Sequence, residues 1–115
     1  MADVVVTVPK RLWEEWLAEG DLPGEQWSGD YSDFWVGGVP VKLCVGERVY
    51  VVCNQKLRGY SPLYCLYKEG KRCALVRRGG AVACTVDEEI KGFRGFRYRW
   101  WDRNDEKSFE DWRTL

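Results

Sequence analysis

Histidine is missing from this chain of 115 residues, and no pair of cysteines follows the CxxC pattern. The absence of histidine excludes mechanisms that depend on an imidazole, including Ser-His-Asp and Cys-His sites. It also removes a common ligand of zinc, which usually needs closely paired cysteines or cysteine with histidine. A GxxxxGK[ST] phosphate-binding loop is absent as well, so nucleotide hydrolysis of that type has no support. We therefore expect no metal ion and no cofactor.

Long hydrophobic runs are also absent. No stretch of about 18 apolar residues is present to cross a membrane. The first residues, Met1 to Val4, lack the basic start and apolar stretch of a signal peptide. We expect a single domain over residues 1–115 that is cytoplasmic, has no contact with a membrane and is monomeric.

The five cysteines all fall in predicted strands beside Val, Leu or Ala, which favours buried thiols that act as small hydrophobic groups. A disulfide between Cys65 and Cys73 across a hairpin is the alternative. The odd number of cysteines in a chain without a leader argues against it. The cysteines are Cys44, Cys53, Cys65, Cys73 and Cys84.

Charge is balanced overall but unevenly placed. Residues 1–46 hold three Lys/Arg against eight Asp/Glu, whereas residues 56–103 hold twelve against five. This distribution predicts a basic face on a neutral protein. The alternative is ordinary solvated strand edges, on which Lys and Arg discourage pairing with other chains.

The central stretch predicts two antiparallel strands joined by a tight turn. A β-rich run over residues 47–53 is interrupted by Asn54-Gln55, and a second strand leaves through residues 56–58. Gly59 then indicates a bulge or a close backbone approach. The strand resumes over residues 63–67, which are apolar on both faces. We expect one long bent strand, buried at its far end, that curls a small sheet into a barrel.

Other elements are expected on both sides of this hairpin. Residues 4–8 predict a short central strand, and residues 9–20 predict a helix with an apolar stripe. Residues 21–40 have no clear periodicity and are expected to form a long loop. Further strands are predicted at 41–44, 71–78 and 81–90, with turns at Glu69-Gly70 and Gly79-Gly80.

The most unusual stretch runs from Ile90 to Arg103 and is rich in both arginine and aromatic residues. From Phe96 to Trp100 the two types alternate, which predicts an aromatic face toward the core and a face with Arg97 and Arg99. That second face is suited to phosphate groups. The alternative is that these arginines pair with the acidic N-terminal half. Beyond it, Ser108 predicts a short C-terminal helical turn.

The order of strand, helix, long loop and five or six antiparallel strands resembles a PUA-like domain, most similar to the ASCH and EVE types. The resemblance is carried by residues 46–52, by Arg58-Gly59-Tyr60 and by residues 92–98. It implies an α+β, mainly β, PUA-like pseudo-β-barrel of five to seven strands, with one main N-terminal helix. It also implies a cleft between the helix, the long loop and the barrel mouth.

The resemblance implies a nucleic-acid-binding module for RNA or for a modified or flipped-out base, in RNA or modified DNA. Aromatic residues in the long loop fit such a pocket by stacking on a flat ligand, or they cap an open end of the barrel. The predicted pocket residues are Trp27, Tyr31, Trp35 and Tyr60. The residues predicted to hold the nucleic-acid backbone are Arg58, Arg94, Arg97 and Arg99.

Catalysis and protein interaction are the two alternatives. Some ASCH-like domains are ribonucleases, or amidohydrolases that act on modified nucleosides. The amidohydrolases use a Lys and a Thr after the helix, and residues 20–40 contain neither. Here the titratable candidates are the thiols and Asp30, Asp33, Lys42, Glu47, Glu88 and Glu89. Asp30 and Asp33 are close enough to hold Mg²⁺. Exposed aromatic residues would instead serve a protein partner.

Overall fold

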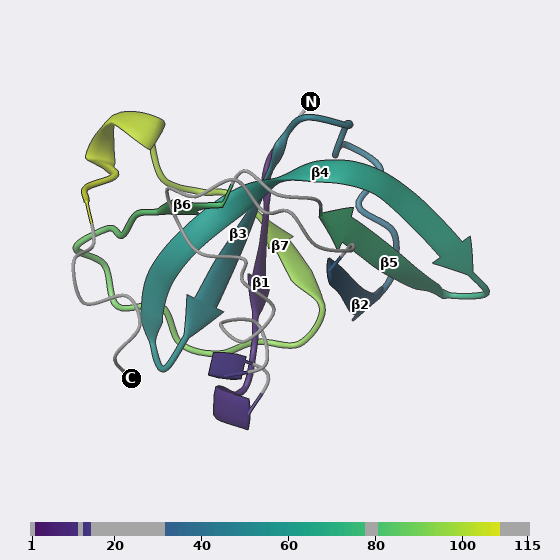
Figure 1. Cartoon of the computed structure of the whole chain (residues 1–115), viewed down its shortest axis with the longest axis horizontal. Coiled ribbons are helices and arrows are strands. Elements are labelled where there is room, and N and C mark those ends of the chain that lie inside the picture. Colours follow the sequence, from purple (N-terminus) through teal and green to yellow (C-terminus); the bar gives the residue numbers. More distant parts are fainter. Residues whose placement is uncertain (1, 12, 15–31, 78–80, 109–115) are drawn as a thin grey trace.

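A computed structural model describes residues 2–11, 13–14, 32–77 and 81–108, and these residues are mainly β. They form one seven-stranded sheet that curls on itself (Figure 1). The strands are β1 (Val4–Thr7), β2 (Ser32–Gly37), β3 (Arg48–Cys53), β4 (Lys56–Glu69), β5 (Arg72–Arg77), β6 (Val82–Ala83) and β7 (Phe96–Tyr98). A short 3-10 helix, η1 (Arg103–Asp105), follows β7.

The strands are ordered β2-β5-β4-β3-β1-β7, with β6 paired to β4. β1 runs parallel to β3 and antiparallel to β7, so it is an internal strand. A strand of this kind is covered on both faces and reads as a continuous apolar run. The sequence Val4-Val5-Val6 is such a run, and its residues are at most 2 % exposed. The prediction of a central first strand is confirmed.

The predicted hairpin turn is also confirmed. Cys53 pairs with Lys56, and the two residues between them, Asn54 and Gln55, have φ of 52° and 65°. Positive φ at both central positions defines the turn type whose twist matches the twist of the flanking strands. Asn tolerates this backbone well, but a glutamine side chain is strained in it.

Replacing Gln55 by glycine is therefore expected to stabilise the protein by about 0.5 kcal/mol. Glycine removes the steric strain at positive φ, which is worth about 1–2 kcal/mol, but it also makes the unfolded chain more flexible. Chemical unfolding of wild type and variant measures the difference. The matched change Asn54→Gly should give less, and equal gains at both positions would show that Gln55 carries no special strain.

Two bulges bend β4, so that it pairs with β3 in one half of the sheet and with β5 in the other. Opposite β3, Val51 pairs with Gly59 but Val52 pairs with Leu57, so Arg58 is an extra residue. Opposite β5, Leu63 pairs with Arg77 and Cys65 with Val76, so Tyr64 is a second extra residue. Bulges bend a strand and increase its twist. The predicted bulge near Gly59 and the long bent strand are confirmed.

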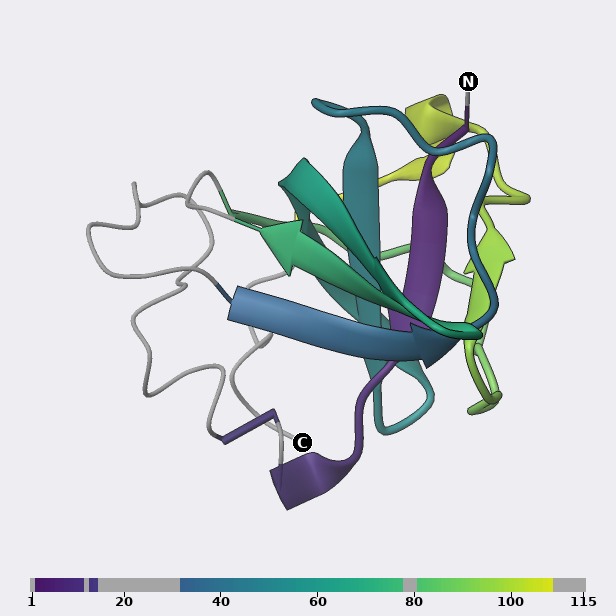
Figure 2. The ribbon, with the colours of Figure 1, turned by 90° about the vertical axis from the view of Figure 1, so that its right-hand side faces the viewer.

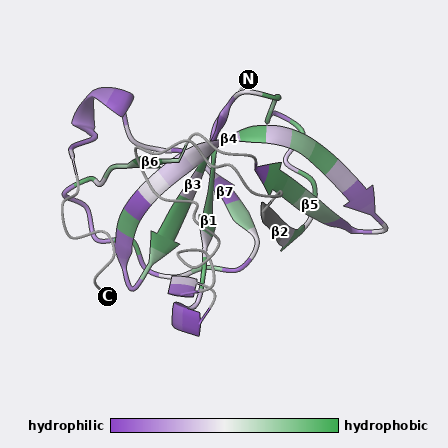
Figure 3. Cartoon of the chain, in the orientation of Figure 1, coloured by the Kyte–Doolittle hydropathy of each residue, from purple (hydrophilic) through white to green (hydrophobic). Residues whose placement is uncertain are grey.

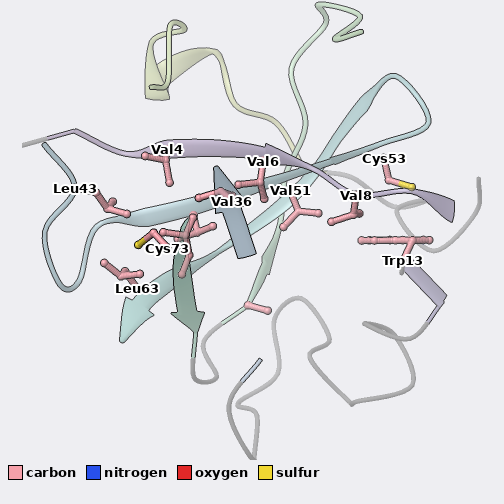
Figure 4. Close-up of a cluster of buried hydrophobic side chains, with 13 residues drawn as sticks. Val4, Val6, Val8, Trp13, Val36, Leu43, Val51, Cys53, Leu63 and Cys73 are labelled. Atoms are coloured by element: carbon pink, nitrogen blue, oxygen red, sulfur yellow. The ribbon is translucent and has the colours of Figure 1, made fainter. Parts of the chain in front are cut away.

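The central strands separate two apolar clusters. The larger cluster fills the inside of the curl, where Trp13 lies beside Val8 and Cys53 at one end and Leu43 and Leu63 lie at the other (Figure 4). The second cluster lies on the opposite face of β1 and β3, beneath residues 84–101. In Figure 3 the strands β1, β3 and β5 are accordingly hydrophobic along most of their length.

The two ends of the sheet approach each other and close part of the curl. A Cβ placed on Gly95 would lie 3.4 Å from the carbonyl oxygen of Gly37, and one on Gly38 would lie 3.6 Å from Cε1 of Phe96. Gly37 ends β2 and Phe96 begins β7, and Figure 2 shows β2 and β5 crossing β1 at a steep angle. We call this contact between Gly37 and Gly95 the seam.

Several predicted elements differ from the structure. The long loop of residues 21–40 includes β2, because residues 32–37 pair with all six residues of β5. Residues 41–44 are not a strand but a turn followed by irregular chain, and of the predicted strand 81–90 only β6 and a bridge between Thr85 and Lys107 form. The turn at Gly79-Gly80 lies outside the described residues.

The predicted main helix is not confirmed. Of the described residues in its range, 10, 11, 13 and 14 are helical, and the amide of Trp13 donates to the carbonyl of Pro9 at 3.1 Å. The rest of residues 9–20 and the predicted C-terminal turn after Ser108 lie outside the described residues. Within the described part of the chain, no helix is long and apolar enough to span a membrane.

The far end of β4 is less buried than expected. Tyr64 and Tyr67 are 45 % and 57 % exposed, although this part of the strand was predicted to be buried. The prediction that all five cysteines are buried holds for only three of them. Cys53, Cys73 and Cys84 are buried, whereas the other two are not, and all five are free thiols. Cys44 is exposed because it lies in the irregular segment before β3, which is not paired with another strand.

Candidate nucleic-acid interface

An exposed cluster of aromatic and basic side chains lies on the outer face of β2, β5 and β4. Trp35 of β2 is 41 % exposed, and its ring meets that of Tyr67 edge to face with centroids 6.1 Å apart. The guanidinium carbon of Arg72 lies 5.4 Å from the centroid of Trp35. These three residues are called the Trp35 surface.

The pairing of the strands explains why these side chains gather. Trp35 and Tyr67 both pair with Ala74 of β5, one on each side, so all three side chains point to the same face. Ala74 is small and only 1 % exposed, so the two rings approach each other above it. A hollow of about 190 Å³ lies beside Trp35, Glu69 and Arg72. This volume is below the roughly 300 Å³ of small-molecule pockets, so the surface is shallow and does not form a deep pocket.

A second cluster contains Arg97. Its guanidinium carbon lies 5.2 Å from the centroid of Phe93 and 5.6 Å from that of Trp100. The indole of Trp100 donates to Glu88 Oε2 at 2.8 Å and packs edge to face on Trp101. Trp100 is 42 % exposed and lines a hollow of about 450 Å³. Phe93, Arg97 and Trp100 are called the Trp100 surface.

The predicted alternation of aromatic and basic residues holds only within β7. Phe96 and Tyr98 pack against the inner cluster, and Arg97 between them is exposed. The strand ends at Tyr98, so the alternation does not continue to Trp100. The prediction that Trp100 faces the core is wrong, and its neighbour Trp101, 8 % exposed, is buried instead.

Arg58 is placed in the interior. It is the extra residue of the first bulge in β4 and is 2 % exposed. Its Nε donates to the carbonyl oxygen of Cys53 at 2.9 Å, and its guanidinium carbon lies 6.0 Å from the ring of Trp13. Burial lowers the pKa of Arg58 from its ordinary value. A guanidinium in this position does not reach a nucleic-acid backbone on the surface.

Arg99 is neutralised by Asp3 from the acidic N-terminal half. The Nε atom of Arg99 lies 3.0 Å from Asp3 Oδ2, and a second guanidinium, that of Arg103, lies 2.7 Å from the same oxygen. Arg99 also donates to the carbonyl of Trp101. For Arg99, the alternative that the arginines pair with the acidic N-terminal half is confirmed. Arg97 has no such carboxylate partner among the described residues.

Tyr60 belongs to a separate cluster around Glu106. The guanidinium carbon of Arg48 lies 4.1 Å from the centroid of Tyr60, and Arg48 donates to Glu106 Oε1 at 2.9 Å. Glu106 Oε2 accepts from Tyr50 at 2.5 Å and from the indole of Trp101 at 2.9 Å. Burial, reinforced by Glu106, raises the pKa of Tyr50 above its usual range. These contacts tie η1 and the chain after it to β3.

The structure therefore divides the predicted pocket. Trp35 and Tyr60 have different aromatic partners in the described part of the chain, Tyr67 for the former and Tyr50 for the latter. Arg94 is exposed, and neither it nor Arg97 has an acidic partner among the described residues. Trp27 and Tyr31 lie outside the described residues.

Sequence reasoning missed four residues of the two surfaces: Phe93 and Trp100 on one, Tyr67 and Arg72 on the other. The sequence predicts a buried strand end at Tyr67. The charged pair Lys68-Glu69 that follows it was the available signal that this strand runs out into solvent. Arg72 was counted only as part of the basic segment, because its contact with Trp35 depends on β2, which was not predicted.

Several of the residues considered for catalysis are buried, are engaged in other contacts or lie outside the described residues. Burial raises the pKa of Cys53, Cys73 and Cys84, the last to about 12, so these thiols are protonated at neutral pH. Glu47 accepts from the amides of Ala2 and Cys44. Asp30 and the side chain of Asp33 lie outside the described residues. Within the described ranges, no group of three or more Cys, Asp or Glu side chains is placed to hold a metal ion.

No protein-family model, no curated protein and no solved structure matches this chain. The resemblance to PUA-like domains of the ASCH and EVE types therefore stays a prediction. The fold and the two surfaces rest on the sequence and on the structure alone.

Proposed function

We propose that this protein is a nucleic-acid-binding module that stacks a base on the Trp35 surface. The observation that carries the proposal is the exposed ring of Trp35, which contacts the ring of Tyr67 and lies close to the guanidinium of Arg72. Proteins that bind single strands combine aromatic platforms for bases with cations for the backbone, and both are present here. The pairing with Ala74 and the ring of Tyr67 hold Trp35 in place before a ligand arrives, which lowers the entropy lost on binding.

The ligand class that fits is a single-stranded or flipped-out base in RNA or modified DNA. The hollow beside Trp35 is smaller than a typical small-molecule pocket, so the described residues support stacking on one face. Trp27 and Tyr31, which lie outside the described residues, are proposed to cover the other face. In this proposal the fold is PUA-like, and the monomer is the binding species.

Trp35→Ala is expected to weaken binding of a short single-stranded oligonucleotide about 5- to 150-fold. Loss of stacking on one aromatic ring costs about 1–3 kcal/mol per base, and about 1.4 kcal/mol corresponds to a tenfold change in Kd. Fluorescence anisotropy with labelled oligo-U and oligo-dT at low salt measures the change. Affinity of the wild type should fall as salt rises, because bound phosphates release counterions.

Two further variants separate stacking from folding. Trp35→Phe keeps an aromatic face and should retain most of the affinity, and Val41→Ala changes a residue that is 81 % exposed and outside both surfaces. Thermal unfolding of each variant shows whether the fold is retained. If Trp35→Ala folds normally and binds as tightly as Val41→Ala, the Trp35 surface is not a base platform.

A further inference from the structure

The seam places the Trp35 and Trp100 surfaces next to each other. Arg72 of β5 pairs with Gly37 of β2, Gly37 contacts Gly95, and Arg97 follows two residues later. Neighbouring strands lie about 5 Å apart and a strand rises about 3.3 Å per residue. The backbones of Arg72 and Arg97 are therefore within roughly 20 Å of each other along this path.

Both arginines also lie on the outer side of the curled sheet. Cys73 and Leu75, which alternate with Arg72, point into the inner cluster, so Arg72 points outward. Phe96 and Tyr98 pack against the same inner cluster, so Arg97 points outward as well. The path between the two surfaces is bare backbone at the seam, since Gly37 and Gly95 carry no side chains that would block a ligand.

Positive charge without acidic partners collects along this path. Arg48, Arg99 and Arg103 have carboxylate partners elsewhere. In contrast, four exposed cations beside the seam have no carboxylate partner among the described residues. They are Lys71, Arg72, Arg94 and Arg97.

The rings of the two surfaces orient Arg72 and Arg97 without neutralising them. A guanidinium that stacks on an aromatic face keeps its N–H donors in its own plane, where they remain available for a phosphate oxygen. The hollow of about 450 Å³ beside Trp100, lined by Glu88, Arg97, Tyr98 and Trp100, is the larger of the two and lies in the size range of small-molecule pockets.

We propose that a single strand of nucleic acid crosses the seam, with one base on Trp35, its phosphates on these four cations and a second base in the hollow beside Trp100. This inference rests on the proposed function and makes the ligand a strand of several nucleotides. A modified single base would need only the Trp35 surface. These contacts do not distinguish ribose from deoxyribose, because phosphates and base faces are common to RNA and DNA.

The test is a titration of labelled oligo-U and oligo-dT of one to twelve nucleotides against the full chain. Affinity should rise at least tenfold between the dinucleotide and about six nucleotides and then level off. Trp100→Ala and Arg97→Gln should each weaken the ten-nucleotide ligand at least fivefold and leave the dinucleotide unchanged. Trp35→Ala should weaken both lengths. Arg97→Gln keeps both aromatic rings, so it tests the path even if Trp100→Ala does not fold.

The possible failures are distinct. If Trp35→Ala weakens binding but affinity does not depend on length, or Arg97→Gln has no effect on the ten-nucleotide ligand, the second site is overturned and the proposed function remains. If no oligonucleotide binds at low salt, both are overturned. A polyglutamate peptide of equal charge is the control for the cations alone. Binding of that peptide as tight as that of the ten-nucleotide ligand would overturn base stacking and favour an acidic protein partner.

Discussion

Replacing Asp3 by alanine is expected to lower the free energy of unfolding by about 3–5 kcal/mol, which is a large part of the stability of a small domain. Asp3 is 2 % exposed and accepts from the backbone amide of Arg48 and from the guanidiniums of Arg99 and Arg103. Alanine leaves the amide without this acceptor and leaves two close arginines without their shared anion. The contacts join the start of β1 to β3 and to the chain after β7.

The pH dependence identifies the carboxylate as the cause. Burial by itself raises the pKa of Asp3, but hydrogen bonds from Arg48, Arg103 and Arg99 outweigh it, and the pKa lies below its ordinary value. A lowered pKa in the folded state gives stability that is complete above the pKa of the unfolded state, near 4, and is lost as the pH falls from there through the folded-state pKa. The difference in stability between wild type and Asp3→Ala should therefore begin to shrink as the pH falls below about 4 and continue to shrink through the folded-state pKa of Asp3.

The matched control is the surface ion pair of Lys107 and Asp87. Its nitrogen and oxygen are also 2.7 Å apart, but the side chains are 59 % and 83 % exposed. Exposed pairs contribute about 0.5 kcal/mol or less, so Asp87→Ala should change little. Urea unfolding of both variants between pH 3 and pH 7 measures the effects. Similar losses for Asp3→Ala and Asp87→Ala would mean that Asp3 is not the anchor inferred here.

The parts of the fold that follow from local rules were predictable. The turn at Asn54-Gln55 and the bulge near Gly59 follow from turn chemistry and from glycine placement, and the central position of β1 follows from its unbroken apolar run. β2 was not predictable in this way. It is an edge strand whose order comes from pairing with β5, about forty residues away, and Trp35 and Gly37 within it carry no strong pattern of their own.

The candidate site was predictable in composition but not in arrangement. Exposed tryptophan beside arginine was expected. Trp35 is exposed beside Arg72, and Arg97 is exposed beside Trp100. Which arginines remain free depends on long-range partners. Arg99 meets Asp3, 96 positions earlier in the sequence, and Arg58 is turned inward by a bulge. Neither outcome can be deduced from a local pattern, because basic residues look alike until their partners are placed.

Gly59→Ala is expected to destabilise the protein by about 2–4 kcal/mol. A Cβ at this position would lie 2.4 Å from the carbonyl oxygen of Val82, closer than such atoms approach, and 3.3 Å from the carbonyl carbon of the same residue. Gly59 pairs with Ala83, so the backbone of β6 must move away from β4 to admit a methyl group. Overpacking costs about 1–3 kcal/mol, and the loss of strand pairing adds to it.

The control for Gly59→Ala is Gly37→Ala, another glycine in a strand. A Cβ on Gly37 has no heavy atom within 4 Å, and its φ is not in the left-handed region. Alanine there should leave stability unchanged or raise it by about 0.5 kcal/mol, since it restricts the unfolded chain. Chemical unfolding compares the two variants. Hydrogen exchange of the Cys84 amide, which donates to Arg58 at 3.3 Å, reports on β6 directly. Faster exchange in Gly59→Ala but not in Gly37→Ala locates the damage between β4 and β6, whereas equal stability of the two variants would mean that the backbone of β6 moves aside freely.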